Sequence, residues 1–237
     1  MAEVRRGSTA PANPETTRLL AALPRRRTNR HPFSETPVDP PQQEELRRAA
    51  ALEGCRLHVV DDPVQRRQLG VLARRAHDSQ MADPAFRAEL ASWTGTTDDR
   101  YDGVPVSAGG PLPAPQDMWV IRDFTAGRGA ARVPGKDFEE QPVIAVLTAT
   151  LPGRAGDVQA GEALQHVLLA ATAEGLAASY LSQLVEVPEA RDRVQRLLGT
   201  ARPPQLALRI GHGWPTAPTP RRPVADLLLK EDAPGQR

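Results

Sequence analysis

The nine residues from Pro142 to Thr150 constrain the fold more than any other part of this sequence. They read PVIAVLTAT, with apolar side chains at successive positions and no charge. A strand that is apolar on both faces lies inside a sheet whose two sides are both covered. We therefore expect this strand in the interior of a sheet, with a layer of structure on each face.

A long apolar helical pattern follows in the stretch from Gly161 to Gln183, GEALQHVLLAATAEGLAASYLSQ. Its larger apolar residues recur at the spacing i, i+3, i+4 and i+7, namely Leu164, Val167, Leu168 and Ala171. This spacing predicts a buried helix, and Gly175 is expected to end it in the position that favours glycine. The segment from Leu176 to Leu184 is then expected to be an ordered loop that presents backbone N–H groups to a ligand.

Helix start signals and short apolar runs place the remaining elements. Helices are predicted at Glu15–Leu23, at Pro41–Leu52, after Asp62-Pro63, after Asp83-Pro84 and at Val187–Leu198. Strands are predicted at Cys55–Val60, Asp117–Arg122 and Gln205–Gly211. The residues from Trp93 to Gln116 have no usable period, so we expect a long loop of the kind that forms a lid or reaches a partner.

The length of 237 residues, with 40% hydrophobic residues, suffices for one sizeable core. We expect a single domain over residues 15–230, a disordered leader over 1–14 and a flexible tail over 231–237. The single cysteine, Cys55, excludes an internal disulfide and fits a reducing compartment. The sequence has no apolar run that could span a membrane and no apolar core of a secretory signal, so we expect a cytoplasmic protein without a membrane partner.

The 30 basic and 29 acidic residues nearly cancel, so no general attraction to nucleic acid is expected. Several arginines are nevertheless clustered in two short segments. The run RRRTNR at residues 25–30 could hold a phosphate through charge-assisted hydrogen bonds, although a solvated basic surface or a nucleic-acid contact is the more common role of such a cluster. Arg221 and Arg222 could bind the same phosphate as this run, or they could lie in an ordinary surface turn.

Several common catalytic patterns are absent from the sequence. The five histidines show no spacing typical of a metal site, so no metal is expected. There is no GxSxG nucleophile elbow and no P-loop, and Cys55 has no activating context. The candidate site therefore consists of arginines and a loop, and no obligatory catalytic residue is expected.

Three segments, in the right order, resemble the FMN-dependent nitroreductase superfamily and, within it, the actinobacterial Acg-type branch. They are RRRTNRHPF at residues 25–33, GEALQHVLLAATAEGLAASYLSQLVEVPE at 161–189 and LALRIGHGWPTAPTPRRPVADLL at 206–228. The resemblance implies an α+β fold, a nitroreductase-like three-layer sandwich with a mostly antiparallel central sheet flanked by helices. It also implies a homodimer with FMN at the interface.

Acg-type proteins look like internal duplications, and this sequence resembles their second, flavin-binding half. Such a half is expected to pair with itself. The loop from Trp93 to Gln116 or the C-terminal tail is the expected exchanged element.

The resemblance implies roles for individual residues. The family's N-terminal run that binds the phosphate and ribityl groups is matched by Arg26, Arg27, Thr28 and Arg30, with threonine in place of the more usual serine. The C-terminal arginine that also reaches the phosphate is matched by Arg221 or Arg222. The loop whose backbone N–H groups approach N5 and O4 of the isoalloxazine is matched by Leu181, Ser182 and Gln183, where the Glu-Gly pair of many members is missing.

The implied function is that of an FMN-dependent oxidoreductase that transfers hydride between reduced flavin and a small organic substrate. NADPH or NADH is the candidate external reductant. This chemistry needs a donor near N5 and positive potential near N1 and O2, in agreement with a site of arginines and backbone amides. The alternative is a non-catalytic protein that binds and sequesters FMN.

Overall fold

The computed structural model describes residues 11, 13–133, 139 and 141–228. The leader predicted over residues 1–14 lies almost entirely outside these described residues. The tail predicted over residues 231–237 lies outside them completely.

A four-stranded antiparallel sheet forms the middle of the molecule. Its order is β1-β4-β6-β5, and each neighbouring pair of strands is antiparallel. The strands are β1 (Cys55–Val59), β4 (Val143–Ala149), β6 (Pro204–Gly211) and β5 (Ala177–Tyr180). The expectation of a mostly antiparallel central sheet is confirmed.

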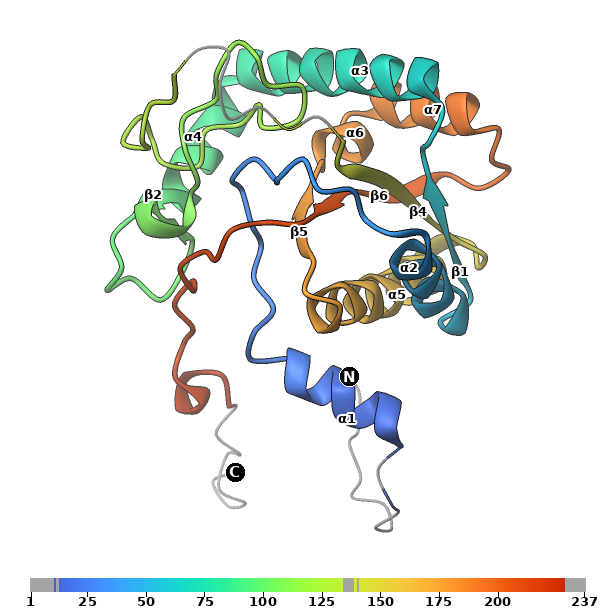
Figure 1. Ribbon diagram of the computed structural model, residues 1–237. Coiled ribbons are helices and arrows are strands. Elements are labelled where there is room, and N and C mark those ends of the chain that lie inside the picture. Colours follow the sequence, from blue (N-terminus) through green and yellow to red (C-terminus); the bar gives the residue numbers. More distant parts are fainter. Residues whose placement is uncertain (1–10, 12, 134–138, 140, 229–237) are drawn as a thin grey trace, which may run out of the picture.

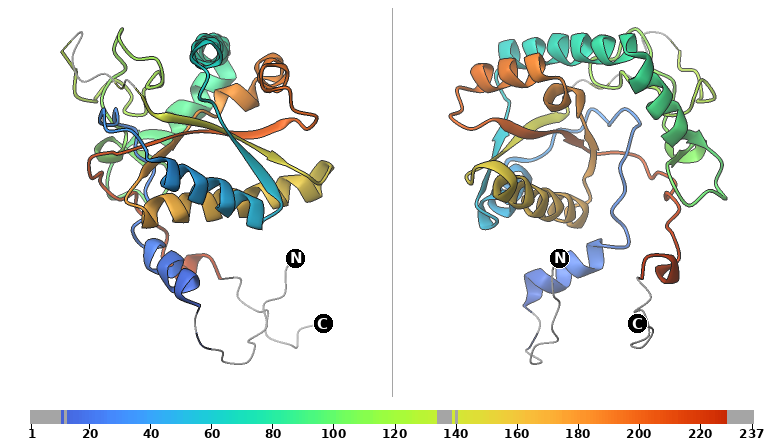
Figure 2. Two further views of the ribbon diagram at one scale, coloured as in Figure 1. Left: turned by 45° about the vertical axis from the view of Figure 1, so that its right-hand side comes forward. Right: turned by 180° about the vertical axis from the view of Figure 1, so that it is seen from behind.

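Helices cover both faces of this sheet, so the expected three-layer arrangement is confirmed (Figure 1). One face carries α2 (Pro40–Leu52) and α5 (Gly153–Ala173), and α1 (Pro14–Ala22) packs against α5. The other face carries α3 (Pro63–Ala82), α6 (Gln183–Glu186) and α7 (Pro188–Leu198). Helix α4 (Pro84–Trp93) follows α3 and leads away from the sheet (Figure 2).

The side chains of β4 alternate between two separate hydrophobic cores. Val143, Ala145 and Leu147 belong to the core shared with α2 and α5, whereas Ile144 and Val146 belong to the core shared with α3, α6 and α7. All seven residues of β4 are buried. Since burial of a large aliphatic side chain contributes about 1.5–3 kcal/mol, this strand ties the three layers together, as its sequence predicts.

Helix α5 begins at Gly153, earlier than the Gly161 that the apolar pattern suggests. Pro152 sets the start, since it precedes the first helical residue with an extended backbone. Gly175 follows the last turn with a φ of +74°, so the predicted glycine termination is confirmed. The small residues on α5 are buried against the sheet and α2, namely Ala160, Ala163 and Ala170.

Two expectations about local structure are wrong. The segment from Leu176 to Leu184 is not a loop throughout, because residues 177–180 form the edge strand β5 and pair with β6. The predicted strand from Asp117 to Arg122 is irregular. Its apolar residues Trp119 and Ile121 are buried in the core beneath α3, so their spacing reflects burial without a partner strand.

The segment from Trp93 to Gln116 contains more structure than its sequence indicates. β2 (Thr94–Thr96) and β3 (Val104–Pro105) form a small parallel sheet, and the 3₁₀ helix η1 (Val106–Ala108) follows. These short elements hold the loop against the rest of the molecule beside the end of α4.

Residues 212–228, here called the C-terminal arm, leave β6 and run past the β2 region to the end of the molecule where α1 lies (Figures 1 and 2). The arm is irregular except for the short helix η2 (Val224–Asp226). Within the described part of the chain, no helix has the length and apolar character needed to cross a bilayer.

Candidate functional site

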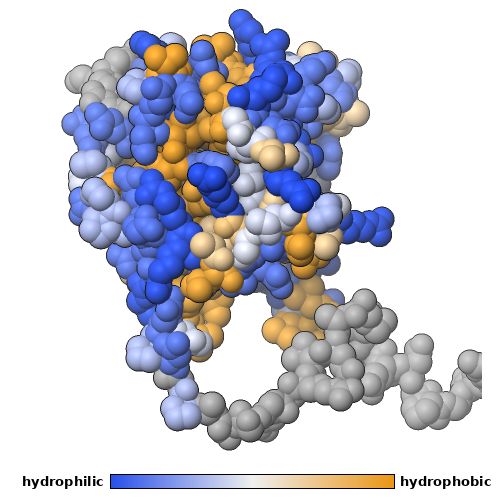
Figure 3. All heavy atoms as spheres, turned by 90° about the vertical axis from the view of Figure 1, so that its right-hand side faces the viewer, coloured by the Kyte–Doolittle hydropathy of each residue, from blue (hydrophilic) through white to orange (hydrophobic). Residues whose placement is uncertain are grey.

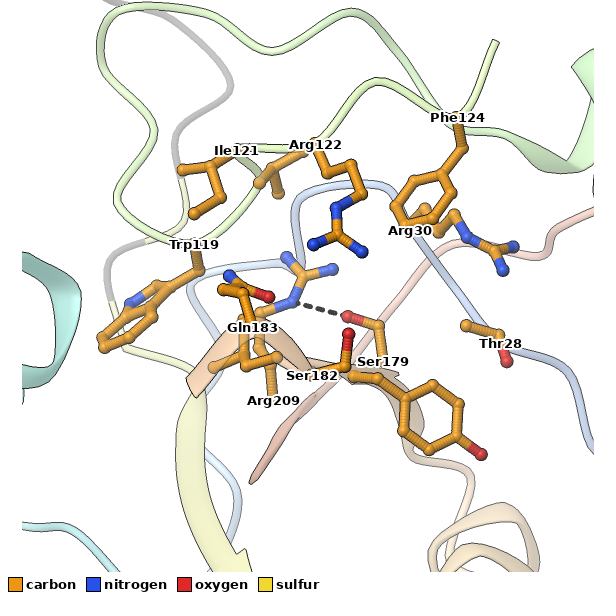
Figure 4. A pocket seen from close by; sticks show the side chains of 13 residues that line it. Thr28, Arg30, Trp119, Ile121, Arg122, Phe124, Ser179, Ser182, Gln183 and Arg209 are labelled. Carbon is orange, nitrogen blue, oxygen red and sulfur yellow. Dashed lines mark hydrogen bonds between the residues drawn. The ribbon is translucent and has the colours of Figure 1, made fainter. Parts of the chain in front are cut away.

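A pocket lies at the β5 edge of the central sheet, where four distant parts of the chain meet (Figure 4). Its lining comes from Thr28 and Arg30, from residues 119–122 and Phe124, from residues 179–183 and from Arg209 of β6. The irregular segment after β3 forms one wall. The end of β5 and the start of α6 form the opposite wall.

The N-terminal segment reaches this pocket because it extends the sheet edge. Thr28 forms a parallel bridge with Ala178 of β5, and the Asn29 N–H donates to the Ala178 carbonyl at 2.9 Å. The Asn29 side chain is 3% exposed and donates to the Trp214 carbonyl at 2.7 Å. These bonds hold Thr28 and Arg30 beside β5.

Arg209 is the buried cation that joins the parts of the site. It is 1% exposed, and its Nε donates to the Ser179 hydroxyl at 3.1 Å, the bond that Figure 4 marks. Its Nη2 donates to the Asn29 and His31 carbonyls at 3.2 and 3.0 Å. Its Nη1 pairs with the buried carboxylate of Glu139 at 2.7 Å. The charge of Arg209 is thus compensated inside the protein.

Arg30 and Arg122 bring further positive charge to the pocket. Arg30 donates to the Ala108 carbonyl at 3.1 Å and lies over the Phe124 ring at 4.6 Å. Burial lowers the pKa of Arg30 to about 10, with a small opposing effect from Tyr180. Burial also lowers the pKa of Arg122, and Glu186 partly opposes this shift. Within the described residues, no ion pair joins either guanidinium to a carboxylate, so both favour a bound anion.

The turn after β5 supplies backbone donors. The Leu181 N–H bonds to the Ala207 carbonyl, and the Leu184 N–H bonds to the Leu181 carbonyl. The N–H groups of Ser182 and Gln183, which lie between these two, have no hydrogen bond to another described residue. The turn therefore has two amides available for a ligand at the pocket wall.

The structure brings together some of the predicted site residues. Those that line the pocket are Thr28, Arg30, Leu181, Ser182 and Gln183. Arg26 and Arg27 lie on the same segment but outside the lining, and Arg27 donates to the Pro24 and Arg26 carbonyls. Arg26 is close enough to Tyr180 to oppose the rise that burial causes in the tyrosine pKa.

Arg221 and Arg222 do not meet the pocket within this chain. Arg222 makes a two-bond ion pair with Asp102, at 2.8 Å through Nε and 2.5 Å through Nη2. Arg221 donates to the carbonyls of Thr219 and Pro220. Both lie in the exposed C-terminal arm, so a shared site with Arg30 would need a second copy of the chain.

The other lining residues were not predicted as site residues, among them Trp119, Arg122, Phe124 and Arg209. Only Arg209 carried a signal, because a charged residue in the apolar strand LALRIG must be paired when it is buried. In the described part of the chain there is also no cluster of three metal-ligating side chains.

Comparisons with known proteins place the chain among its relatives. The chain is 30% identical over 207 residues to the Mycobacterium tuberculosis protein named "Putative NAD(P)H nitroreductase acg", covering 86% of this chain and 62% of the relative. It is 30% identical over 217 residues to the uncharacterized protein Rv3127 of the same organism, covering 90% and 62%. The chain therefore spans about three fifths of the length of these relatives. The predicted resemblance to the Acg type is confirmed.

Two solved structures show the same fold. A Desulfovibrio desulfuricans protein described as a "putative nitroreductase in complex with fmn" has a TM-score of 0.52 at 22% identity, covering 94% of this chain and 99% of that one. The NADPH:FMN oxidoreductase of Vibrio harveyi complexed with NAD+ has a TM-score of 0.55 at 14% identity, covering 93% and 80%. The model of the nitroreductase family matches residues 23–214. This match includes the sheet, both helical layers and the pocket, and the chain belongs to the nitroreductase family.

Proposed function

We propose that the pocket binds FMN and that the protein is an oxidoreductase that transfers hydride between reduced flavin and a small organic substrate. One observation carries the proposal. Arg30, which has no carboxylate partner among the described residues, lines the same pocket as Ser182 and Gln183, whose backbone N–H groups bond to no other described residue. Cationic and backbone donors around one pocket suit a cofactor with an anionic tail and a ring that accepts hydrogen bonds.

The lining fits the chemistry of FMN. Trp119, Ile121 and Leu181 are core residues that form the apolar base of the pocket, and the half-buried Phe124 ring offers aromatic surface to a planar ring. Thr28 and Arg30 would hold the ribityl and phosphate end, with Arg26 and Arg27 on the same segment. When bound, FMN supplies the hydride transfer, while the protein binds and orients it. FMN appears in the names of both solved relatives above, which supports the assignment.

We further propose that the protein is a homodimer with FMN at the interface. The cavity in the single chain is about 190 Å³, below the roughly 300–1,000 Å³ of a whole ligand site. Val224, Leu227 and Leu228 of the C-terminal arm are 64–71% exposed, and Figure 3 shows apolar side chains on the two projections at the lower end of the molecule. A partner would cover this surface, and its Arg221 or Arg222 would complete the pocket.

NADPH or NADH is the proposed external reductant, in a cycle that reduces the flavin first and the substrate second. The cytoplasm is the proposed compartment, since the one cysteine is a free, buried thiol. The decisive experiment is an absorbance spectrum of the purified protein after reconstitution with FMN, followed by anaerobic mixing with NADPH or NADH. We expect bound-flavin absorbance and prompt bleaching. A protein that takes up no flavin would contradict the proposal, and bound flavin that neither nicotinamide bleaches would favour the sequestering role.

A further inference from the structure

We propose that Arg122 sets the substrate class of this pocket, by binding an anionic group such as a carboxylate on a planar aromatic substrate. This inference rests on the proposed function, because it assigns the substrate of the same site. It starts from a guanidinium that the sequence pattern did not single out and that the FMN assignment leaves without a role.

The position of Arg122 directs its charge into the pocket. The residue comes from the irregular segment after β3, and its guanidinium lies between Trp119 and Phe124 in the view of Figure 4. It lies over the rings of Phe86 and Phe124, at 5.2 and 5.9 Å from their centres. These contacts hold the cation by stacking and leave much of its hydrogen-bonding capacity for a ligand.

Arg122 uses few of its N–H donors for hydrogen bonds within the protein. Its Nη2 donates to the Gln80 side-chain oxygen, and no other acceptor among the described residues receives a bond from this guanidinium. Its Nε is buried and has no partner among the described residues. A guanidinium has five N–H donors, and an unpaired buried donor costs about 1–3 kcal/mol. A ligand with acceptor oxygens would bond to the remaining N–H groups of the two Nη atoms.

The nearest carboxylate does not neutralise this charge directly. Glu186 accepts a 2.8 Å bond from the Gln80 amide, and that same amide side chain accepts from Arg122. A neutral group thus stands between the two charges. Arg209 differs, because Glu139 pairs with it at 2.7 Å and two backbone carbonyls take its remaining donors. Unlike Arg209, Arg122 therefore keeps N–H donors on its Nη atoms for an anion, while Arg30, the other lining cation without a carboxylate partner, is assigned above to the cofactor.

The surrounding surface favours an aromatic anion. Phe124 lies beside the guanidinium within the pocket lining, and Phe86 lies against it from outside the lining. A planar aromatic carboxylate could stack on the half-buried Phe124 ring while its oxygens accept from Arg122. A neutral compound of the same shape would keep the stacking and lose the charge-assisted bonds, which are roughly twice as strong as neutral ones.

The test compares 4-nitrobenzoate with 4-nitrobenzamide, which share a shape and differ in charge. Their dissociation constants are measured by calorimetry, with and without bound FMN, for the wild type, Arg122→Gln, Arg122→Lys and the control Arg154→Gln. Arg154 is an exposed residue in the first turn of α5, on the other face of the sheet. We expect the wild type and the control to bind nitrobenzoate at least tenfold more tightly than nitrobenzamide.

The Arg122→Gln variant should lose this preference and keep its affinity for nitrobenzamide. The Arg122→Lys variant should keep part of the preference, and it carries the test if Arg122→Gln fails to fold. Equal affinities for the two compounds in FMN-loaded wild type would overturn the inference and leave the proposed function intact. A protein that prefers nitrobenzoate and takes up no FMN would overturn the proposed function alone.

Discussion

Arg209 links the N-terminal segment to the sheet through bonds that no surface residue could replace. It donates to the backbone of Asn29 and His31, and it pairs with Glu139, whose side chain is 4% exposed. Burial raises the pKa of Glu139, and the charge of Arg209 works against that shift. Removal of the arginine would leave this carboxylate buried without its partner, and would release the segment that carries Thr28.

We therefore expect Arg209→Met to lower the free energy of unfolding by about 3–5 kcal/mol, the range for breaking a buried ion pair from one side. Chemical denaturation measures the change. The double variant Arg209→Met/Glu139→Gln should recover a good part of the loss, because the uncompensated charge is gone. A double variant less stable than Arg209→Met would show that the pairing energy is not the cause.

Arg30 provides the corresponding test for the cofactor. A charge-assisted hydrogen bond contributes about 1.5–3 kcal/mol, so Arg30→Gln should weaken FMN binding by about tenfold or more. Fluorescence titration of FMN gives the dissociation constant. Arg25→Gln is the matched control, since Arg25 lies in the same basic run, is exposed and contacts the Ala21 carbonyl. Equal losses in both variants would mean that FMN senses only the general charge of the run.

At the scale of elements, the sequence predicts those whose pattern is long and whose ends carry a stop or start residue. Helix α3 begins at Pro63 after an Asp62 cap, and α4 begins at Pro84 after an Asp83 cap, as expected. Strand β5 escapes detection because its four residues show no alternation and it lies at the edge of the sheet. The segment from Asp117 to Arg122 was wrongly predicted as a strand, because burial of Trp119 and Ile121 in the core gives the same alternation of apolar residues as a strand.

The end of α5 can be tested with two glycines that differ only in backbone conformation. Gly175 has a φ of +74°, Gly161 lies inside the helix, and a Cβ at either position would meet nothing within 4 Å. Gly175→Ala should cost about 1–2 kcal/mol, because a side chain disfavours the left-handed conformation. Gly161→Ala should stabilise by about 0.5–1 kcal/mol. Thermal denaturation of both variants checks the opposite signs, and a neutral Gly175→Ala would mean that the chain there relaxes freely.

At the scale of the whole molecule, the pocket is a product of topology. Thr28, Phe124, Ser182 and Arg209 are distant in sequence, and they meet only because the N-terminal segment joins β5 and the loop after β3 folds over it. Sequence patterns could suggest the Thr28 and Ser182 segments through resemblance to a family. Sequence patterns could not predict that Arg122 lines the pocket, since its local sequence is the same whether the arginine lies on the surface or between aromatic rings.

The exposed apolar side chains of the C-terminal arm allow a test of the proposed dimer. Leu227 and Leu228 are 64% and 67% exposed, and burial of such side chains against a partner would contribute about 1.5–3 kcal/mol each. The double variant Leu227→Asp/Leu228→Asp should therefore dissociate the proposed dimer, as measured by light scattering after gel filtration. It should also weaken FMN binding, because the partner's arginines would leave the pocket.

Val158→Asp is the control for this variant, since Val158 is 63% exposed on α5, away from the arm. It introduces a charge at an equally exposed apolar position and should leave both the dimer and the FMN affinity unchanged. A wild type that is monomeric at micromolar concentration and yet binds FMN tightly would contradict the dimer proposal. In that case the donors of Arg30 and of the turn after β5 would suffice for the cofactor, and the arm would have to serve another contact.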